Sequence, residues 1–546
     1  MAMHGAPARG PREAPAGAVA DGGAAATGGG DGGIHPAEVA LLASVFVVAA
    51  CGLLYELAAG ALASYLLGDS VLQFSTIIGA YLFAMGIGSW LSRHVEHQLV
   101  AQFLRIELMV GLIGGLMPAA LFVVHGLLPG DAGLAFRVVL YGLVLVVGTL
   151  VGLEIPLVMR ILKRHFRERY ALKDLVSQVL TFDYLGALAV AVAFPLLLVP
   201  HLGLIRTGLF FGLLNAAVAV WALWLFRNEL RAWRAHAAAS AAVVGLLLAG
   251  LAGSDRLTSW AEDSFYGGDI VHREQSDYQR IVVTSGTAGV RLFLNGNLQF
   301  HSRDEYRYHE ALVHPALLAH GAPQRVLILG GGDGMALREV LRHASVREVT
   351  LVELDPRITG LFARQPLLRR LNADALADPK LTIVNADAFG WLQQPRGVYD
   401  VVIVDFPDPS NFSLGKLYTT TFYESVDQHL AAGGYLVVQS TSPLIARRSF
   451  WTVVRTLEAV GLQTWPYHVH VPSFGEWGFV LAGRRPLRAA QHLPALPEGL
   501  RFLTGEVWPT LFQFPPDMAR VPAEPNRLSN QVLVHVFEQE WGAVHE

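Results

Sequence analysis

Charge and cysteine are both scarce in this sequence. Charged residues make up 16% of its 546 residues, against about a quarter in a typical soluble protein, and hydrophobic residues make up 53%. The single cysteine, Cys51, excludes an intramolecular disulfide and a metal site built from cysteines. Because the net charge is −4 and no basic surface dominates, nucleic acid is not an expected partner. A chain this long and this apolar is expected to combine a membrane domain with soluble ones.

Residues 1–35 are mostly Gly, Ala and Pro, and almost none of them is large and apolar. Such a segment cannot bury enough surface to offset the entropy lost on ordering, so we predict a disordered tail. A cleaved signal peptide is not expected, because the first apolar run starts only after His35 and is long enough to be retained as a span.

Seven apolar runs then follow one another, at 37–58, 71–92, 106–128, 136–158, 176–199, 204–226 and 237–253. Each of the first six exceeds the roughly 18 residues that a helix needs to cross the hydrocarbon core, whereas the seventh is shorter and rich in alanine. These runs predict an α-helical multi-pass domain over residues 36–254, with six or seven transmembrane helices in the lipid bilayer of the cell membrane.

Basic side chains are concentrated in the even-numbered loops between these runs. The fourth loop is the richest, with Arg160, Lys163, Arg164, Arg167, Arg169 and Lys173. Basic loops usually stay in the cytoplasm, which places these loops and the N-terminal tail there. A seventh run that crosses would put everything after Gly253 outside the cytoplasm, whereas a re-entrant or interfacial run would keep it inside.

The chain beyond Asp255 is typical of soluble domains. Residues 270–300 alternate apolar and polar side chains around the turn signals Ser285-Gly286 and Asn295-Gly296, which predicts a small antiparallel β domain within 255–305. Strands alternating with helices then predict a parallel, doubly wound α/β domain over 306–485, Rossmann-like and of the methyltransferase type. Its strands are expected at 325–329, 349–352, 381–384, 401–404 and 435–438. Residues 486–546 form a C-terminal extension, with an amphipathic helix near 526–541 and no assigned function.

The segment RVLILGGGDGMALREVL indicates a strand, a glycine turn and a helix. Gly330, Gly331 and Gly332 allow a tight turn and a close approach of a ligand to the backbone. The next strand ends in Glu353, placed to bind ribose hydroxyls, and the third is followed by Asp387, which can accept from an adenine amino group. Contiguous glycines favour a single nucleoside over a dinucleotide. An ordinary strand–helix turn without a ligand is the alternative.

Asp333 lies inside the glycine turn, where an ordinary methyl donor would place its amino-acid carboxylate. Two anions at close range in a dry site repel strongly. A donor that keeps its ammonium group and lacks the carboxylate would instead find a partner. The sequence therefore favours decarboxylated S-adenosylmethionine over S-adenosylmethionine.

The segment DVVIVDFPDP puts Asp405 and Asp408 after the fourth core strand. Two carboxylates suit a cationic amine, and an amine with a pKa of about 10 must lose a proton before it attacks the carbon beside a sulfonium. We assign Asp405 as the proton acceptor, and Asp408 and Asp333 as partners of ammonium groups. Tyr308 and His309 would orient the amine by hydrogen bonds. Two other interpretations stay open, Asp408 as a turn former and His309 as a core or helix-capping residue.

With these residues in place, the chain resembles the polyamine aminopropyltransferases, or spermidine synthases. The likeness runs through DYQRIVV, LNGNLQFHSRDEYRYHE, LILGGGDGMALREVL, VELD, NADAF, IVDFPDP, LAAGGYLVVQS and WGFVLA, from Gln279 to about Ala482. It implies transfer of an aminopropyl group to an amine, by default putrescine to give spermidine, with release of methylthioadenosine. Some bacterial members are similar to this chain in carrying a multi-span N-terminal half.

The resemblance also implies roles for individual residues. The methylthioadenosine part of the donor would contact Gln279, Glu353, Asp387 and Ala388. The amine site would be lined by His309, Asp333 and residues 405–408, with Asp405 as proton acceptor. No bound cofactor and no metal are expected. The family implies a homodimer, and a catalytic domain in the cytoplasm, where the donor is made.

Three departures from the family pattern concern the amine acceptor. Phe406-Pro407 replaces the usual pair of small polar residues between the two loop aspartates, and Phe412 stands where a proline is common. The segment HVPSFGEWGF lacks a tyrosine that typically helps to bind the diamine. The acceptor is therefore open between putrescine and a bulkier or less usual amine.

Two other functions stay open. An S-adenosylmethionine-dependent methyltransferase would use the same sheet, and a polyamine transporter or sensor would keep a soluble half that binds and no longer catalyses. Glu56, Glu154 and Asp183 lie inside apolar runs and bear on the transporter function. An ionised group in lipid is costly, so these residues are candidates for binding a polyamine that crosses the bilayer. The alternative is a structural role, in which these residues lie near the ends of spans or pair with Arg137 or Arg206.

Overall fold

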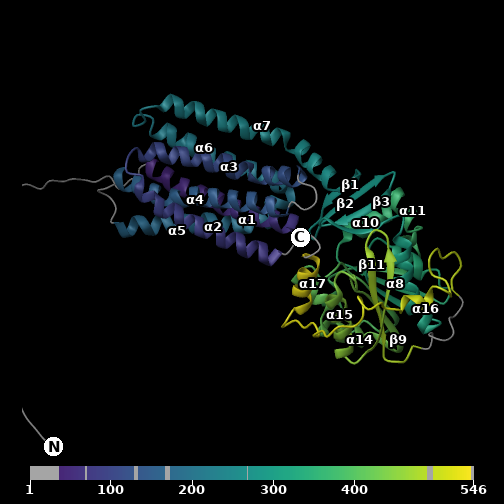
Figure 1. Cartoon of the computed structure of the whole chain (residues 1–546). Helices are drawn as coiled ribbons and strands as arrows, with labels where there is room; N and C mark the ends of the chain where they lie inside the picture. Colours follow the sequence, from purple (N-terminus) through teal and green to yellow (C-terminus); the bar gives the residue numbers. More distant parts are fainter. Residues whose placement is uncertain are drawn as a thin grey trace, which may run out of the picture.

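The computed structural model describes residues 36–67, 70–127, 133–165, 172–266, 268–487 and 496–542. The predicted tail over residues 1–35 lies outside these described residues. An elongated bundle of helices leads into a part built from two sheets and their covering helices (Figure 1).

The bundle contains every predicted apolar run as a helix. These are α1 (Pro36–Leu67), α2 (Ser70–Leu91), α3 (Leu99–Leu127), α4 (Gly133–His165), α5 (Leu172–Ala193), α6 (Val199–Leu225) and α7 (Trp233–Tyr266). Among the described residues, 6 helical stretches are long and apolar enough to cross a membrane. One of them, Lys173–Leu225, joins α5 and α6 through a π-helical segment and a break at Gly203, where φ is 73°.

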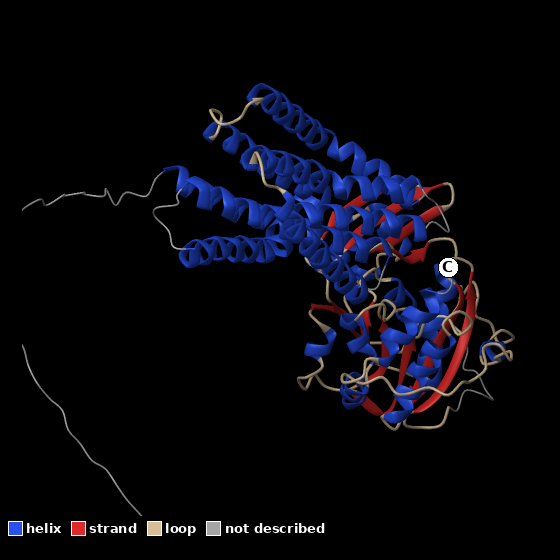
Figure 2. Cartoon of the chain, turned by 60° about the vertical axis from the view of Figure 1, so that its left-hand side comes forward, coloured by secondary structure: helices blue, strands red, loops and turns tan. Residues whose placement is uncertain are grey.

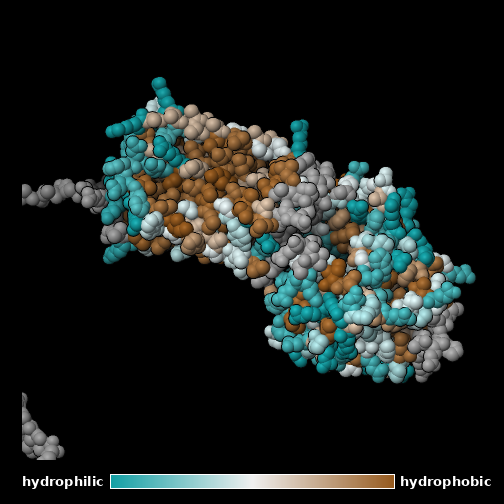
Figure 3. Space-filling model, in the orientation of Figure 1, coloured by the Kyte–Doolittle hydropathy of each residue, from teal (hydrophilic) through white to brown (hydrophobic). Residues whose placement is uncertain are grey.

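The outer surface of the bundle is apolar, and its interior is closely packed. Figure 3 shows an apolar band along the visible face, and Phe83 and Trp224 are 67% and 69% exposed. Inside, a Cβ added to Gly88 of α2 would lie 2.0 Å from the carbonyl oxygen of Thr149 on α4. Exposed apolar side chains outside and small residues between helices are the pattern of a lipid-facing bundle.

The seventh run is a full-length helix. This helix, α7, packs against α3 and α6 and ends beside the smaller of the two sheets. Two contacts join the basic segments at the other end of the bundle: Arg160 donates to the carbonyl oxygen of Ser92 at 2.9 Å, and His165 lies 2.8 Å from Glu229. The basic segments and the sheets therefore lie at opposite ends of the bundle (Figure 1). If all seven helices cross and the basic segments stay in the cytoplasm, the sheets lie on the other face of the membrane.

Opposite ends of the bundle should be labelled from opposite faces of the membrane. In a Cys51→Ala background, we expect a cysteine at Arg227 to react with an impermeant maleimide from the cytoplasmic face only, because the basic loops stay there. A cysteine at Glu424, exposed on the soluble part, should react from the other face only. Labelling of both positions from one face would contradict a full crossing by α7.

The predicted small β domain is a four-stranded antiparallel sheet. Its strands are β1 (Asp269–Gln275), β2 (Arg280–Gly286), β3 (Gly289–Leu294) and β4 (Asn297–His301), in that order. Asn295 and Gly296 make the last turn with φ of 49° and 85°, as the Asn-Gly signal predicts. The buried face packs on α10 (Pro356–Arg364), where the rings of Phe300 and Phe362 are 5.9 Å apart.

The second sheet has seven strands in the order β10-β11-β9-β8-β5-β6-β7. The predicted strands are β5 (Arg325–Gly330), β6 (Glu348–Glu353), β7 (Leu381–Asn385), β8 (Tyr399–Asp405) and β9 (Leu430–Gln439), and they pair in parallel. The Rossmann-like class is confirmed, with one addition: β10 (Gln463–Val471) and β11 (Gly475–Gly483) form an antiparallel edge hairpin. Gly330 pairs with Asp405, so the carboxyl ends of β5 and β8 meet.

Helices cover both faces of this sheet, seen as blue ribbons around the red strands in Figure 2. The longer ones are α8 (Glu305–His320), α14 (Thr420–Gln428) and α15 (Arg447–Ala459), and the short ones are α9 (Met335–Val340), α11 (Pro366–Leu371), α12 (Ala388–Trp391), α13 (Phe412–Gly415) and α16 (Trp508–Leu511). The expected C-terminal helix is α17, which begins only at Val532. Before it, the buried side chain of Asn526 donates to the carbonyl oxygens of Gly415 and Tyr418, both at 3.1 Å, and holds this segment against the sheet domain.

Candidate active site

The glycine turn exists because two strand ends approach each other closely. Gly330 and Gly331 have φ of 84° and 66°, values that favour glycine. A Cβ on Gly330 would lie 2.2 Å from the carbonyl oxygen of Asp405, and one on Gly332 would lie 2.7 Å from Cγ of Glu353. The turn thus brings backbone against both acidic residues that the sequence had singled out.

Glu353 is held by backbone at the end of β6. Its Oε2 accepts from the Gly332 amide at 3.2 Å and its Oε1 from the Asp355 amide at 2.9 Å. Burial raises the pKa of Glu353 to about 7. Gln279 reaches the same place through Asp355, whose Oδ2 accepts from Gln279 at 3.0 Å and from Ser276 at 2.6 Å. Sequence reasoning missed Asp355, the second acidic residue of the VELD segment.

Asp387 lies farther along the same sheet edge, at the start of α12. Its Oδ1 accepts from the Phe389 amide at 3.2 Å, and its Oδ2 is 2.8 Å from the ammonium group of Lys416. The next residue, Ala388, is buried. Lys416 was not foreseen, because it comes from a different loop. A carboxylate has about four lone-pair sites, so Asp387 can still accept from a ligand.

Asp333 lies between the Glu353 end and the Asp405 end of the site. Its Oδ1 accepts from the Met335 amide at 2.9 Å, and its charge interacts with both Glu353 and Asp405. Burial raises the pKa of Asp333, and the nearby His309 opposes that shift. The turn therefore puts a carboxyl group at the centre of the candidate site.

Asp405 and Asp408 are both held by side chains from other elements. The hydroxyl of Tyr308 donates to Oδ1 of Asp405 at 2.7 Å. Asp408 accepts from Gln439 at 3.3 Å and from the Thr441 hydroxyl at 3.2 Å. Burial raises the pKa of Asp405 to about 6 and that of Asp408 to about 7. These partners make Asp408 more than a turn former.

His309 is buried on α8 and anchored through one ring nitrogen. Its Nδ1 lies 2.8 Å from Oε2 of Glu305, which also accepts from Arg338 at 2.9 Å. Burial alone would lower the pKa of His309, but the contact with Glu305 outweighs burial and raises it. Among the described residues Nε2 has no hydrogen-bond partner, so it is available to the site, and the raised pKa favours the charged form of His309 near Asp333 and Asp405.

Aromatic rings surround Tyr308 at the Asp405 end of the site, and some of them come from the segment that lacks the expected tyrosine. The ring of Tyr308 is 5.3 Å from that of Phe479 and 6.1 Å from that of Phe474, and Trp477 donates to Gln439 at 3.2 Å. The unusual Phe406 is buried in the core against Phe422. Sequence reasoning missed Gln439 and Trp477, which are remote from the loop aspartates in the chain.

The C-terminal extension also reaches this site. Trp541 on α17 donates to Oγ1 of Thr441 at 3.3 Å, and Thr441 in turn holds Asp408. The ring of Phe412, another departure from the family pattern, is 5.7 Å from that of His535 on α17. Both departures in the loop region are therefore explained by packing inside this chain.

The raised pKa of Asp408 predicts a pH-dependent cost to stability. Its carboxyl group ionises near its usual value, 3.8, when unfolded and at about 7 when folded, so its contribution to stability is full below pH 4 and is lost as pH rises through 7. Asp408→Asn should therefore raise the free energy of unfolding at pH 8 by on the order of a few kcal/mol, and by less at pH 5. The melting temperature should rise accordingly. Thermal melts of both proteins test this, and an unchanged or lower melting temperature at pH 8 would contradict it.

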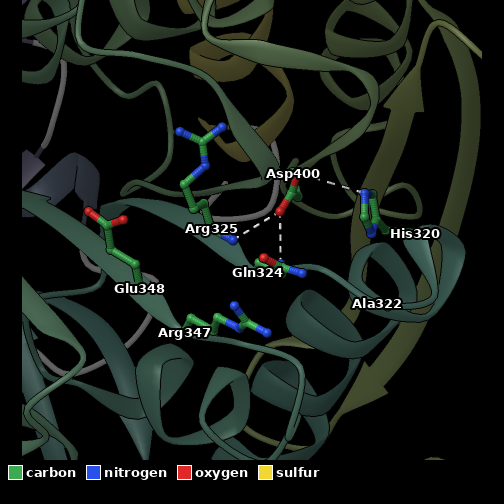
Figure 4. Close-up of a pocket in the computed structure, with 7 residues that line it drawn as sticks. All are labelled: His320, Ala322, Gln324, Arg325, Arg347, Glu348 and Asp400. Atoms are coloured by element: carbon green, nitrogen blue, oxygen red, sulfur yellow. Dashed lines mark hydrogen bonds and ion pairs between the residues drawn. The ribbon is translucent and has the colours of Figure 1, made fainter.

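A separate hollow lies at the opposite, amino-terminal edge of the sheet. It has a volume of about 430 Å³ and is lined by His320, Ala322, Gln324, Arg325, Arg347, Glu348 and Asp400 (Figure 4). Asp400 accepts there from the backbone amides of Gln324 and Arg325 at 2.8 and 2.9 Å. None of the predicted site residues lines this hollow, so the candidate site is at the carboxyl edge.

Comparison with known proteins shows which proteins this chain is similar to. The family model of the spermine/spermidine synthase domain matches residues 305–488. Polyamine aminopropyltransferase 1 of Ralstonia nicotianae is 55% identical over 525 residues, which cover 94% of this chain and 97% of that protein. The polyamine aminopropyltransferase of Leptospira interrogans is 50% identical, over 93% of this chain and 99% of its own length. A crystal structure of spermidine synthase with the transition state analogue AdoDATO is 28% identical, with a TM-score of 0.42 over 45% of this chain and 86% of that one.

Proposed function

The chain belongs to the polyamine aminopropyltransferases, and we propose that it transfers the aminopropyl group of decarboxylated S-adenosylmethionine to an amine and releases methylthioadenosine. The default acceptor is putrescine and the product is then spermidine, which would make the protein an enzyme of polyamine biosynthesis. The proposed donor side comprises the glycine turn, Gln279, Glu353, Asp387 and Ala388. The proposed amine side comprises Tyr308, His309, Asp333, Asp405 and Asp408.

The surplus of carboxyl groups at one sheet edge carries this proposal. Asp333, Asp405 and Asp408 all have a raised pKa because they are largely, though not fully, buried and have little positive charge around them. A ligand that brings ammonium groups would supply the missing charge, whereas a ligand with its own carboxylate would add to the repulsion. This electrostatic balance favours a decarboxylated donor and a cationic acceptor over the methyl donor of an ordinary methyltransferase.

The proposed reaction is a displacement at the aminopropyl carbon next to the sulfonium. The amine nitrogen forms the new C–N bond, the C–S bond breaks with its electron pair going to sulfur, and methylthioadenosine leaves as a neutral thioether. Asp405 takes the proton that the amine loses, so no general acid is needed. Tyr308 holds Oδ1 of Asp405 at 2.7 Å, which leaves Oδ2 as the oxygen to receive that proton.

The decisive experiment offers the purified full-length protein its proposed donor and a panel of amines. We expect release of methylthioadenosine with at least one amine, and putrescine is the first to try. S-adenosylmethionine with a labelled methyl group, offered in parallel, should transfer no label. Failure to release methylthioadenosine with every amine would refute the proposal, and label transfer would favour a methyltransferase.

We also propose that the active protein is a homodimer inserted in the cell membrane through its helical bundle. The apolar outer surface of the bundle supports insertion, because such a surface is costly in water. The molar mass of the protein in lipid nanodiscs, measured by mass photometry, tests the assembly. A single chain per active particle would refute the dimer.

A further inference from the structure

Two glutamates lie buried inside the helical bundle. Glu107 on α3 and Glu154 on α4 are each 0% exposed. They lie eight and eleven residues from the basic ends of their helices, which is roughly 12 and 16 Å along the axis. Both are inside stretches long and apolar enough to cross a membrane. An acidic side chain at such a depth is costly to keep and is a candidate for function.

Several oxygen atoms around these glutamates lack partners. Asn215 on α6 donates to Oε2 of Glu107 at 3.0 Å. Among the described residues, there is no hydrogen-bond partner for Oε1 of Glu107, for either carboxyl oxygen of Glu154, for Oδ1 of Asn215 or for the Tyr55 hydroxyl. Each of these atoms can accept a hydrogen bond. A buried acceptor without a donor costs roughly 1–3 kcal/mol, so the cluster is built for an occupant that donates.

No described basic side chain neutralises this cluster. Arg206, one of the partners expected for the intramembrane acids, instead binds Ser254 and Asp255. Arg137, the other, is exposed. The charges that do interact with Glu154 are those of Glu107 and Asp183, which are also acidic. The positive charge that the cluster requires must therefore come from a ligand or from protons.

Two further acidic residues lie on helices of the same bundle. Asp183 on α5 is only half-buried, and Glu56 on α1 is 8% exposed. Helix α1 packs along α5 and also carries Tyr55, so these groups lie on neighbouring helices. Glu56 and Asp183 thus add further acidic groups on the helices around the cluster.

We propose that Glu107, Glu154, Asn215 and Tyr55 form a binding site for a protonated amine within the membrane domain. An ammonium group has three donors and no acceptor, which complements a set of unpartnered acceptors. The choice of an amine over an inorganic cation rests on the proposed function, because the catalytic domain would then act on the same class of compound. The membrane domain would bind the substrate or product amine of its own enzyme.

Binding of radiolabelled putrescine and spermidine to the full-length protein in nanodiscs tests this site. An Asp405→Asn/Asp408→Asn background removes two of the three carboxyl groups on the proposed amine side of the catalytic domain and so weakens amine binding there. In it, we expect about one amine bound per chain, and at least tenfold weaker binding after Glu107→Gln or Glu154→Gln. These nearly isosteric changes keep the packing, remove the charge and replace one acceptor oxygen with an amide donor. Tyr55→Phe, which removes a single hydroxyl, should weaken binding less, and Glu96→Gln, at an exposed acid, should leave it unchanged.

Three results would overturn the site. They are the absence of amine binding in the Asp405→Asn/Asp408→Asn background, undiminished binding in both glutamine variants, and displacement of the amine by an equal concentration of sodium or potassium. The last result would identify an inorganic cation site. Aminopropyl transfer by Glu107→Gln and Glu154→Gln should match that of the wild type. If the wild-type protein releases no methylthioadenosine with any amine and the bundle still binds amine as expected, the proposed function is refuted and this site stands.

Discussion

Asp405→Asn is expected to lower kcat for aminopropyl transfer by about 10²–10⁴-fold, the usual contribution of a positioned general base. Asparagine can still accept the Tyr308 hydrogen bond, which spans 2.7 Å in the wild type, so the loop should keep its geometry. It cannot take a proton from the amine. Single-turnover release of methylthioadenosine measures the loss, and the dissociation constant of the donor should be unchanged.

The pH dependence of this variant separates loss of the base from loss of structure. The residual rate should rise with pH toward the amine pKa of about 10, because more of the acceptor is then already deprotonated in solution. The wild-type rate should instead rise through the pKa of Asp405, about 6, as the carboxyl group ionises.

Asp400→Asn is the matched control for Asp405→Asn. It changes an aspartate at the other end of the same strand, where Asp400 accepts from the backbone amides of Gln324 and Arg325. We expect its kcat to equal that of the wild type. If the Asp405→Asn enzyme keeps a near wild-type kcat at pH 7, another group is the proton acceptor.

Local patterns in the sequence predicted the elements that carry their own signal. The apolar runs became helices, the strands before GGGDG and VELD became β5 and β6, and the Asn295-Gly296 signal became a turn. Each of these depends on residues that are neighbours in the chain. The placement of Glu353 and Asp405 at one edge follows, because parallel strands end on the same side of a sheet.

The parts of the site that the sequence did not reveal depend on contacts between distant segments. Gln439 and Thr441 reach Asp408 from more than thirty residues away, and Trp541 reaches Thr441 from 100 residues away. No local pattern marks such partners. The length of α7 was missed for another reason. Its helix continues past Ser254 into a polar segment, so hydropathy marked only the part that could lie in lipid.

The choice between donors should depend mainly on Asp333. Two carboxylates about 4 Å apart at an effective dielectric constant of about 20 repel by about 4 kcal/mol, and partial exposure of Asp333 reduces this. We therefore expect the wild type to bind decarboxylated S-adenosylmethionine about 10²-fold more tightly than S-adenosylmethionine. Asp333→Asn should remove most of that preference, mainly by improving the binding of the carboxylate-bearing donor. Calorimetric titration with both donors measures the ratio.

Two comparisons make the Asp333 prediction specific. Asp387→Asn should weaken both donors equally, because the proposed contact of Asp387 is with adenine, which the two donors share. Because burial raises the pKa of Asp333, the preference of the wild type should also decline as pH falls and the carboxyl group becomes neutral. Equal losses for both donors in Asp333→Asn would instead assign this residue a structural role, through its hydrogen bond to the Met335 amide. A selective gain for S-adenosylmethionine would show that a single carboxylate in the glycine turn decides which nucleoside the enzyme uses.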